Sequence, residues 1–264
     1  MHVRQIVIAL GVLACAWTAQ ADVTMVAQMK GKMMGMNPSG ETITYIKGNK
    51  MRTDQTMGKD KTSTIMDVDG GRMIAVNHSK KEAEVWNMAE MAATLQKVGV
   101  DVSGADVKIT PTGNTKEVAG YQATEHQVSV SVDASMPDSP VKMTVNISGP
   151  SYLSTSAPGA ADYAKFYMNA AEKGFFFGDP RAAKAQPGRA QGMMRMYREM
   201  AEKGIPLESM QTMKMSGSGP MAGILGRMGN GEISTTVTRI SAETLDAALF
   251  DIPAGYKVKE QKVQ

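Results

Sequence analysis

The stretch "TSTIMDVDGGRMIAVNHSKKEAEVWNM", residues 62–88, decides the fold class. It contains short segments rich in β-branched and apolar residues, separated by the turn sequences Asp69-Gly70-Gly71 and Ser79-Lys80-Lys81. Short segments of this kind, joined by turns of Gly, Asp and Ser, are typical of antiparallel strands that follow one another in a sheet. The stretch therefore predicts part of an antiparallel meander.

The meander extends toward the N-terminus. In "VTMVAQMKGKM", residues 23–33, the odd positions carry Val, Met, Ala, Met, Gly and Met, and most even positions are polar. A period of two predicts a strand with one buried face. The segments "ETITYIKG" (41–48) and "NKMRTDQT" (49–56) follow as two more strands, joined by a Gly-Asn turn. The first methionines of the chain are thus expected on one side of a sheet.

Later segments alternate between strand and helix patterns. Residues 88–98 read as a short helix, and residues 106–132 and 141–149 as strands. Residues 160–174 have helical spacing and end at Gly174, and residues 189–204 continue a helix that Asp179-Pro180 would begin and Pro187-Gly188 would interrupt. Two more strands follow, in 208–219 and 231–241. The patterns predict one α+β domain, a curved antiparallel sheet with a helical insertion at about 160–204.

The first 21 residues are expected to be a secretory signal peptide. Arg4 precedes an apolar run, and Ala19-Gln20-Ala21 is a small-x-small cleavage sequence, which leaves a domain of residues 22–264. The alternative is lipidation at Cys15, within "VLAC", which would make an outer-membrane lipoprotein. Cys15 is the single cysteine of the chain, so the exported domain has no disulfide in either case. We expect a periplasmic protein without a transmembrane span.

Four segments resemble a known family of exported bacterial proteins. They are "TYIKGNKMRTD" (44–54), "VAGYQATEHQV" (118–128), "EKGFFFGDPRAAKAQPG" (172–188) and "LFDIPAGYK" (249–257). The chain resembles domain of unknown function 4412, which in turn is similar to the periplasmic lipoprotein carriers and their outer-membrane receptors. The resemblance implies an unclosed barrel, with helices across its mouth and an apolar cavity for acyl chains. It also makes Arg52 the nearest counterpart of the arginine that holds the carriers' lid.

Methionine is the unusual residue of this composition, with 24 copies in 264 residues. Its flexible, polarizable side chain suits either a filled core or the wall of a cavity for an apolar ligand, and these two alternatives stay open. The residues predicted to form such a wall are Met25, Met29, Met33, Met51, Met66, Met73, Phe166, Met193, Met196, Tyr197 and Met200.

Two other uses of methionine are open. Thioethers favour Cu(I), and Met193, Met196 and Met200 are close enough on a helix to be candidate ligands. Exposed methionines such as Met34, Met36 and Met228 would buffer oxidants by forming sulfoxides.

Other chemistry finds little support in the sequence. A net charge of +3 with 21% charged residues argues against a nucleic-acid partner. Residues 67–71, "DVDGG", begin like a calcium loop, but His78 stands where a glutamate is required, so a hairpin turn is expected. His78 and His126 are the only histidines after the leader, and His126, which alternates with valines, is expected to be structural.

The predicted function is a non-enzymatic periplasmic binding protein without a cofactor. It would take up a lipid, or the acyl chain of a lipoprotein, in a Met-rich concave cavity, with envelope proteins as possible partners. The alternatives are a Cu(I)-binding or redox-buffering protein, and a structural envelope protein without a small ligand.

Overall fold

A computed structural model describes residues 22–33, 37–97, 105–135, 142–175, 187–217 and 230–261. The predicted signal peptide, the Asp179-Pro180 helix start and the candidate oxidation sites Met34, Met36 and Met228 lie outside these residues. Within them, no helix is long and apolar enough to cross a membrane.

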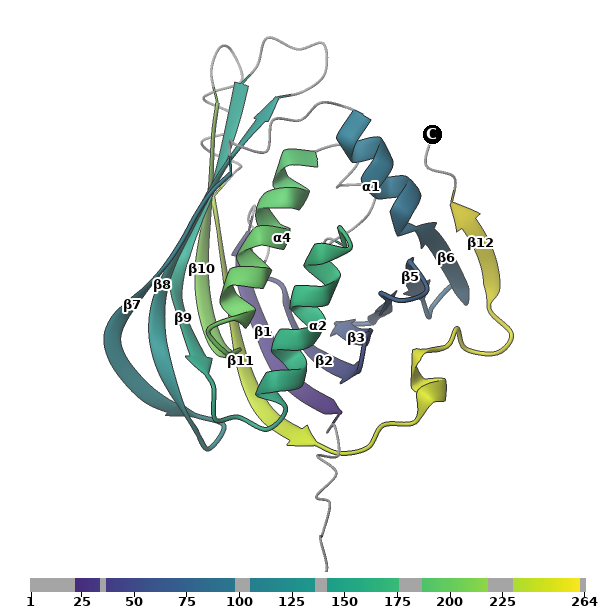
Figure 1. Cartoon of the computed structure of the whole chain (residues 1–264), viewed down its shortest axis with the longest axis horizontal. Helices are drawn as coiled ribbons and strands as arrows, with labels where there is room; N and C mark the ends of the chain where they lie inside the picture. The colour runs from purple at the N-terminus through teal and green to yellow at the C-terminus, as the bar shows by residue number, and fades with distance from the viewer. Residues whose placement is uncertain are drawn as a thin grey trace, which may run out of the picture.

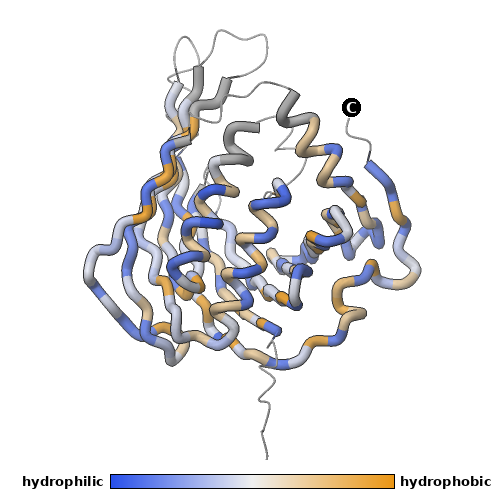
Figure 2. The backbone as a smooth tube through the Cα atoms, viewed as in Figure 1, coloured by the Kyte–Doolittle hydropathy of each residue, from blue (hydrophilic) through white to orange (hydrophobic). Residues whose placement is uncertain are grey.

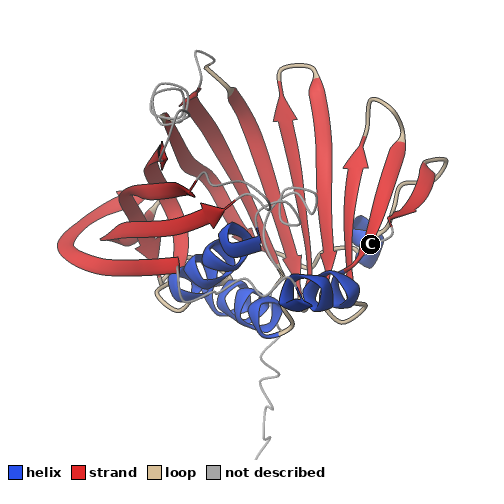
Figure 3. Ribbon diagram, turned by 90° about the horizontal axis from the view of Figure 1, so that it is seen from above, coloured by secondary structure: helices blue, strands red, loops and turns tan. Residues whose placement is uncertain are grey.

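The described chain forms one 12-stranded sheet, in the order β12-β6-β5-β4-β3-β2-β1-β11-β10-β9-β8-β7. The sheet curves strongly and does not close on itself (Figure 1, Figure 3). The strands are β1 Val23–Met33, β2 Ser39–Lys47, β3 Lys50–Met57, β4 Asp60–Asp67, β5 Arg72–Asn77, β6 Glu82–Asn87, β7 Ala105–Val118, β8 Tyr121–Ser135, β9 Lys142–Ser154, β10 Ile205–Gly217, β11 Gly231–Ala242 and β12 Lys257–Gln261. The predicted curved, unclosed sheet is confirmed.

In the described part of the chain, three α-helices lie inside the curve of the sheet (Figure 3). They are α1 Met88–Lys97, α2 Ala160–Glu172 and α4 Pro187–Ala201, and a short 3-10 helix, η3 Ala247–Phe250, lies near the C-terminus. The last two α-helices fall within the predicted insertion. Gly174 follows the end of α2 with a left-handed φ of 73°, as expected for a glycine stop, and α4 begins with Pro187 at its first position.

The meander predicted from residues 62–88 is present as β4, β5 and β6, paired antiparallel in sequence order. Asp67 accepts hydrogen bonds from the Gly70 N–H at 2.8 Å and from Arg72 Nη2 at 2.9 Å. These contacts close a hairpin turn, in agreement with the prediction for "DVDGG". Successive side chains along these strands lie on opposite faces of the sheet. Figure 2 shows hydrophobic and hydrophilic residues interspersed along the backbone.

The two faces of the sheet bury different cores. On the concave face a large cluster includes Met51, Met66, Met73 and Trp86 together with Phe166 of α2, and a second cluster lies under α4. On the convex face Ile65, Ile74 and Val85 pack against Phe250 of η3. Figure 1 shows this C-terminal segment running around the outside of the sheet to β12.

The sequence patterns did not predict β12. It pairs with β6 in parallel, whereas every other described strand pair is antiparallel. A segment of Lys, Glu and Gln around a single valine has no strong strand pattern of its own. Its pairing depends on the convex-face contacts that bring it to the sheet edge.

Candidate functional site

A cavity of about 380 Å³ lies between helices α2 and α4 and the concave face of the sheet. Its volume is within the range of about 300–1,000 Å³ that is usual for small-molecule sites. The residues that line it are Met25, Val128, Ile147, Ser151, Tyr163, Tyr167, Met193, Met196, Tyr197, Met200, Pro206, Ser209, Gln211, Met213, Gly231, Ile233 and Thr235. No Asp, Glu, Lys, Arg or His is among these residues.

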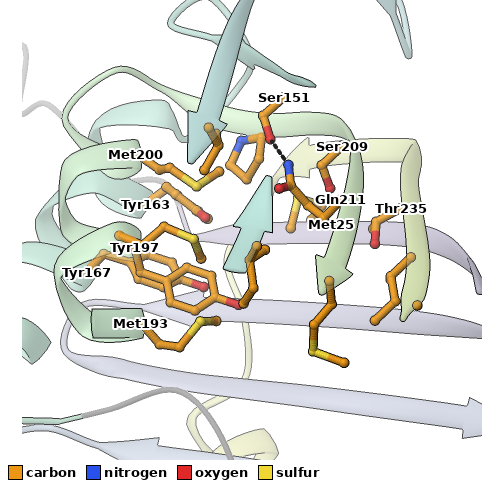
Figure 4. A pocket seen from close by; sticks show the side chains of 17 residues that line it. Met25, Ser151, Tyr163, Tyr167, Met193, Tyr197, Met200, Ser209, Gln211 and Thr235 are labelled. Carbon is orange, nitrogen blue, oxygen red and sulfur yellow. Dashed lines mark hydrogen bonds between the residues drawn. The ribbon is translucent and has the colours of Figure 1, made fainter. Parts of the chain in front are cut away.

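The α4 wall is made by one stripe of the helix. The helical spacing of Met193, Met196, Tyr197 and Met200 puts them on one face, and all four line the cavity. Figure 4 shows Met193, Tyr197 and Met200 on this wall. The opposite face carries ion pairs one turn apart, such as Arg195 Nε to Glu199 Oε1 at 2.8 Å. The amphipathic sequence of α4 therefore orients its thioethers inward.

Three tyrosines join α2 to α4 beside these methionines. The rings of Tyr163 and Tyr167 have centroids 4.5 Å apart, and Tyr167 stacks on Tyr197 at 5.7 Å. Burial raises the pKa of all three phenols above the ordinary value of 10, with further increases at Tyr163 and Tyr167 from neighbouring phenols. The Tyr167 hydroxyl lies 3.8 Å from Met51 Sδ. This wall is uncharged at physiological pH.

The sheet side of the cavity contains a small polar group. Gln211 Nε2 donates to Gly149 O at 3.3 Å, Pro150 O at 3.4 Å and Ser151 Oγ at 3.2 Å (Figure 4). Since carbonyl oxygens only accept hydrogen bonds, these contacts fix the orientation of the amide. Gln211 Oε1 is buried and has no hydrogen-bond partner among the described atoms.

Gly149 allows the strands to approach closely at this point. Its φ is 152°, and a Cβ there would lie 1.9 Å from the carbonyl oxygen of Met210. A side chain at this position would separate β9 from β10, so glycine is required for the local path of the sheet.

Helix α2 is fixed to the sheet by polar contacts at its C-terminal end. Asn169 Nδ2 donates to Asn49 Oδ1 at 2.8 Å, and Asn49 Nδ2 donates in turn to Asp69 at 3.1 Å. Lys173 Nζ is 3.1 Å from the same carboxylate. Two hairpin turns of the sheet thus hold the helix that carries Tyr163 and Tyr167.

The predicted wall residues divide between cavity and core. Met25, Met193, Met196, Tyr197 and Met200 line the cavity. The others are placed as follows: Met51, Met66, Met73 and Phe166 pack in the main core cluster, Met29 is half-buried and does not line the cavity, and the side chain of Met33 is outside the described part. The two alternatives for methionine, a filled core and a cavity wall, therefore apply to different regions. Methionines fill the core beside β3–β5 and line the cavity under α4.

Apart from Met25, sequence reasoning missed the sheet side of the cavity. The strands on this side were predicted, but the alternation along a strand does not show which part of its face a helix covers. The residues missed on these strands are Val128, Ile147, Ser209, Gln211 and Ile233. Residues 160–174 were predicted to be helical, and Tyr163 and Tyr167 on the buried face of α2 also line the cavity.

Arg52 does not hold the helices. Met51 and Arg52 are adjacent on β3 and so face opposite sides of the sheet. On the convex side Arg52 Nη1 donates to Leu249 O at 2.9 Å, and its Nε is 2.6 Å from Asp54. Arg52 therefore secures the C-terminal segment, and its comparison with the carriers' lid arginine is wrong.

The two histidines take part in hydrogen bonds at separate places. His78 lies 2.6 Å from Ser63 Oγ and 2.9 Å from the hydroxyl of Tyr256, on the convex side. His126 Nδ1 lies 3.1 Å from Thr124 O, and its side chain is buried. Neither lines the cavity.

The copper alternative stays a prediction. Met193 and Met200 are separated by about 10 Å along a helix that rises about 1.5 Å per residue. Figure 4 shows them at opposite ends of the tyrosine group. No set of three His, Cys, Asp or Glu side chains in the described ranges could hold a metal ion.

Comparison with solved structures finds distant likenesses. An uncharacterized conserved protein from Thermus thermophilus has 8% identity and a TM-score of 0.40, with 92% of each chain covered. A LolA superfamily protein from Nitrosomonas europaea has 7% identity and a TM-score of 0.28, covering 88% of this chain and 91% of that one. A DUF1329 family protein from Desulfovibrio piger has 8% identity and a TM-score of 0.28, covering 89% and 91%. At these scores the likenesses carry no argument about function.

Comparison with protein families finds a match to part of the chain. No curated protein matches this chain. The model of a domain of unknown function, DUF4412, matches residues 26–148, which include two of the four segments on which the resemblance rested. The resemblance to this family seen in the sequence is confirmed over residues 26–148.

Proposed function

We propose that this protein is a non-enzymatic periplasmic binding protein that takes up the apolar chain of a lipid or of a lipoprotein in the cavity under α4. One observation carries the proposal: a cavity of about 380 Å³ walled by thioethers, aliphatic side chains and neutral phenols, with no charged residue in its lining. An apolar chain is the ligand that such a wall desolvates at least cost.

The energetics favour reversible capture. Each buried CH₂ group contributes about 0.8 kcal/mol, so an acyl chain of roughly a dozen carbons gains roughly 10 kcal/mol on transfer from water. Association costs at least about 4 kcal/mol in lost translational and rotational freedom, which leaves an affinity suited to carrying a lipid and releasing it. Flexible methionines on α4 would adapt to chains of different shape.

The test begins with the protein purified from its native envelope in the absence of detergent. Lipid extraction and mass spectrometry are expected to find a lipid in near-stoichiometric amount. Met196→Trp, which places a large ring in the cavity, is expected to lose that lipid while the protein stays folded. Met210→Trp is the matched control, since Met210 is 56% exposed and does not line the cavity. Repeated absence of lipid from the wild-type protein would refute the proposal.

A further inference from the structure

The concave face of the sheet becomes polar beyond the helices. Met66, Met73 and Trp86 face α2 and α1 from neighbouring positions on β4, β5 and β6. Two residues further along the same strands, and on the same face, are Thr64, Ala75 and Glu84, and two beyond these are Thr62, Asn77 and Glu82. The concave face is therefore apolar under the helices, and beside them it carries polar side chains that can form hydrogen bonds.

A second cavity, of about 280 Å³, lies on this polar part of the sheet. The side chains that line it include Thr62, Thr64, Asn77, Lys80, Glu82 and Glu84. The threonines offer hydroxyls, which donate and accept hydrogen bonds, and the glutamates offer carboxylates, which accept them. Asn77 Oδ1 already accepts from the Lys80 N–H at 2.9 Å, so Asn77 offers the ligand mainly its Nδ2 donors. A group with several hydroxyls would find partners of both kinds here.

Between the two cavities, the concave face of the sheet carries a row of threonines, of which Thr44 is buried. Met25, which lines the first cavity, is the register partner of Thr44 on β2. Thr44 pairs with Thr53 on β3, with their hydroxyls 3.5 Å apart, and Thr53 pairs with Thr64 on β4. Three strand-to-strand steps of about 4.8 Å give a path of about 14 Å, the scale of a disaccharide or a similar head group. We call Thr44, Thr53, Thr64 and Thr62 the threonine track.

We propose that the ligand is an amphiphile with a neutral, polyhydroxylated head, such as the sugar of a glycolipid, whose head lies on the threonine track while its chain fills the apolar cavity. This inference rests on the proposed function, since it needs the chain to occupy the cavity under α4. It adds the chemical class of the head group.

The charges around the track disfavour an anionic head. Phosphates and carboxylates are normally held by clusters of Arg and Lys. The lining of the second cavity has a single cation, Lys80, which is exposed, against Glu82 and Glu84. The nearby Lys259 already pairs with Glu82 at 2.8 Å. A neutral head avoids the repulsion and uses the hydroxyl and amide groups.

The test compares amphiphiles that share a twelve-carbon chain, below their micellar concentrations. Dodecyl maltoside, dodecyl phosphate and dodecanol are titrated into the full chain by displacement of a neutral pyrene-labelled alkyl probe. For the wild type we expect dodecyl maltoside to bind about tenfold more tightly than the other two, the factor that one or two hydrogen bonds supply.

Substitutions on the two faces then locate the effect. Thr62→Val with Thr64→Val, which keeps side-chain shape and strand propensity, should remove the preference for maltoside and leave dodecanol binding unchanged. The matched control is Thr56→Val with Thr236→Val, at positions that face the convex side and touch neither cavity. This control should keep the wild-type preference.

The outcomes separate this inference from the function on which it rests. Equal binding of all three amphiphiles, tighter binding of the phosphate, or an unchanged preference in the track variant would overturn the polyhydroxylated head while chain uptake stands. Failure of all three to bind would overturn both.

Discussion

Replacing a methionine by alanine should have different effects in the two regions of the concave face. Met66 is 2% exposed and packed in the core cluster, whereas Met196 is 7% exposed and borders the cavity under α4. Met66→Ala opens a new void in a filled region, at a cost of about 2–5 kcal/mol of unfolding free energy. Met196→Ala enlarges an existing void and loses fewer contacts, so we expect about 1–2 kcal/mol.

The assay measures both stability and ligand binding. For a domain of this size each kcal/mol lowers Tm by about 2–4 °C, so Met66→Ala should lower Tm by roughly 4–20 °C and Met196→Ala by roughly 2–8 °C. Binding of a neutral fluorescent alkyl probe, measured well below Tm, should change in Met196→Ala and stay at the wild-type value in Met66→Ala. Equal destabilisation of the two variants, with unchanged probe binding in both, would show that the methionines form one filled core and would refute the reasoning.

Three further perturbations test features around this site. Gly149→Ala should cost about 3 kcal/mol or more because its Cβ would overlap Met210 O, while Gly113→Ala, with a φ of 88° but no atom within 4 Å, should cost about 1–2 kcal/mol in chemical denaturation. Arg52→Met should speed amide exchange in Lys257–Gln261, since it removes the contact to Leu249 O, and unchanged exchange would contradict that role. Burial opposes ionisation of Asp67, but hydrogen bonds from Arg72 and Gly70 and the charge of Lys50 outweigh it and lower its pKa below 3.8. The stabilisation from a lowered pKa is present above the pKa of the unfolded state and is lost as the pH falls through the pKa of the folded state. Asp67→Asn should therefore lower Tm at pH 7, and its Tm should approach the wild-type value below pH 3.8. A Tm difference that stays constant with pH would contradict this.

The sequence predicted those parts of the fold that repeat a local pattern. The meander in residues 62–88 and the α2 stop at Gly174 follow from alternation and from backbone preferences that each segment carries itself. The parallel pairing of β12 and the role of Arg52 could not be predicted, because both depend on contacts between residues nearly 200 positions apart, such as Arg52 with Leu249. Local periodicity holds no information about such partners.

Only part of the candidate site could be predicted from the sequence, because local patterns do not show which residues meet in the fold. The α4 stripe shows in the spacing of Met193, Met196, Tyr197 and Met200, and these residues do line one cavity. Met66 and Met73 have the same thioether side chains and were also predicted to line the cavity, yet they lie in a filled core. The position at which a helix crosses the sheet determines whether a methionine below it lines a cavity or lies in a filled core. Tertiary packing sets that position.

The position of β1 in the sheet has a consequence for how the molecule is assembled. This first strand lies between β2, its neighbour along the chain, and β11, whose residues lie about two hundred positions later. Most strand pairs on either side of the β1–β11 junction join strands that follow one another in the chain, but the junction itself forms only after nearly the whole polypeptide is available. Contacts between residues this far apart in the sequence form late in folding, so this junction is expected to be the last part of the sheet to close.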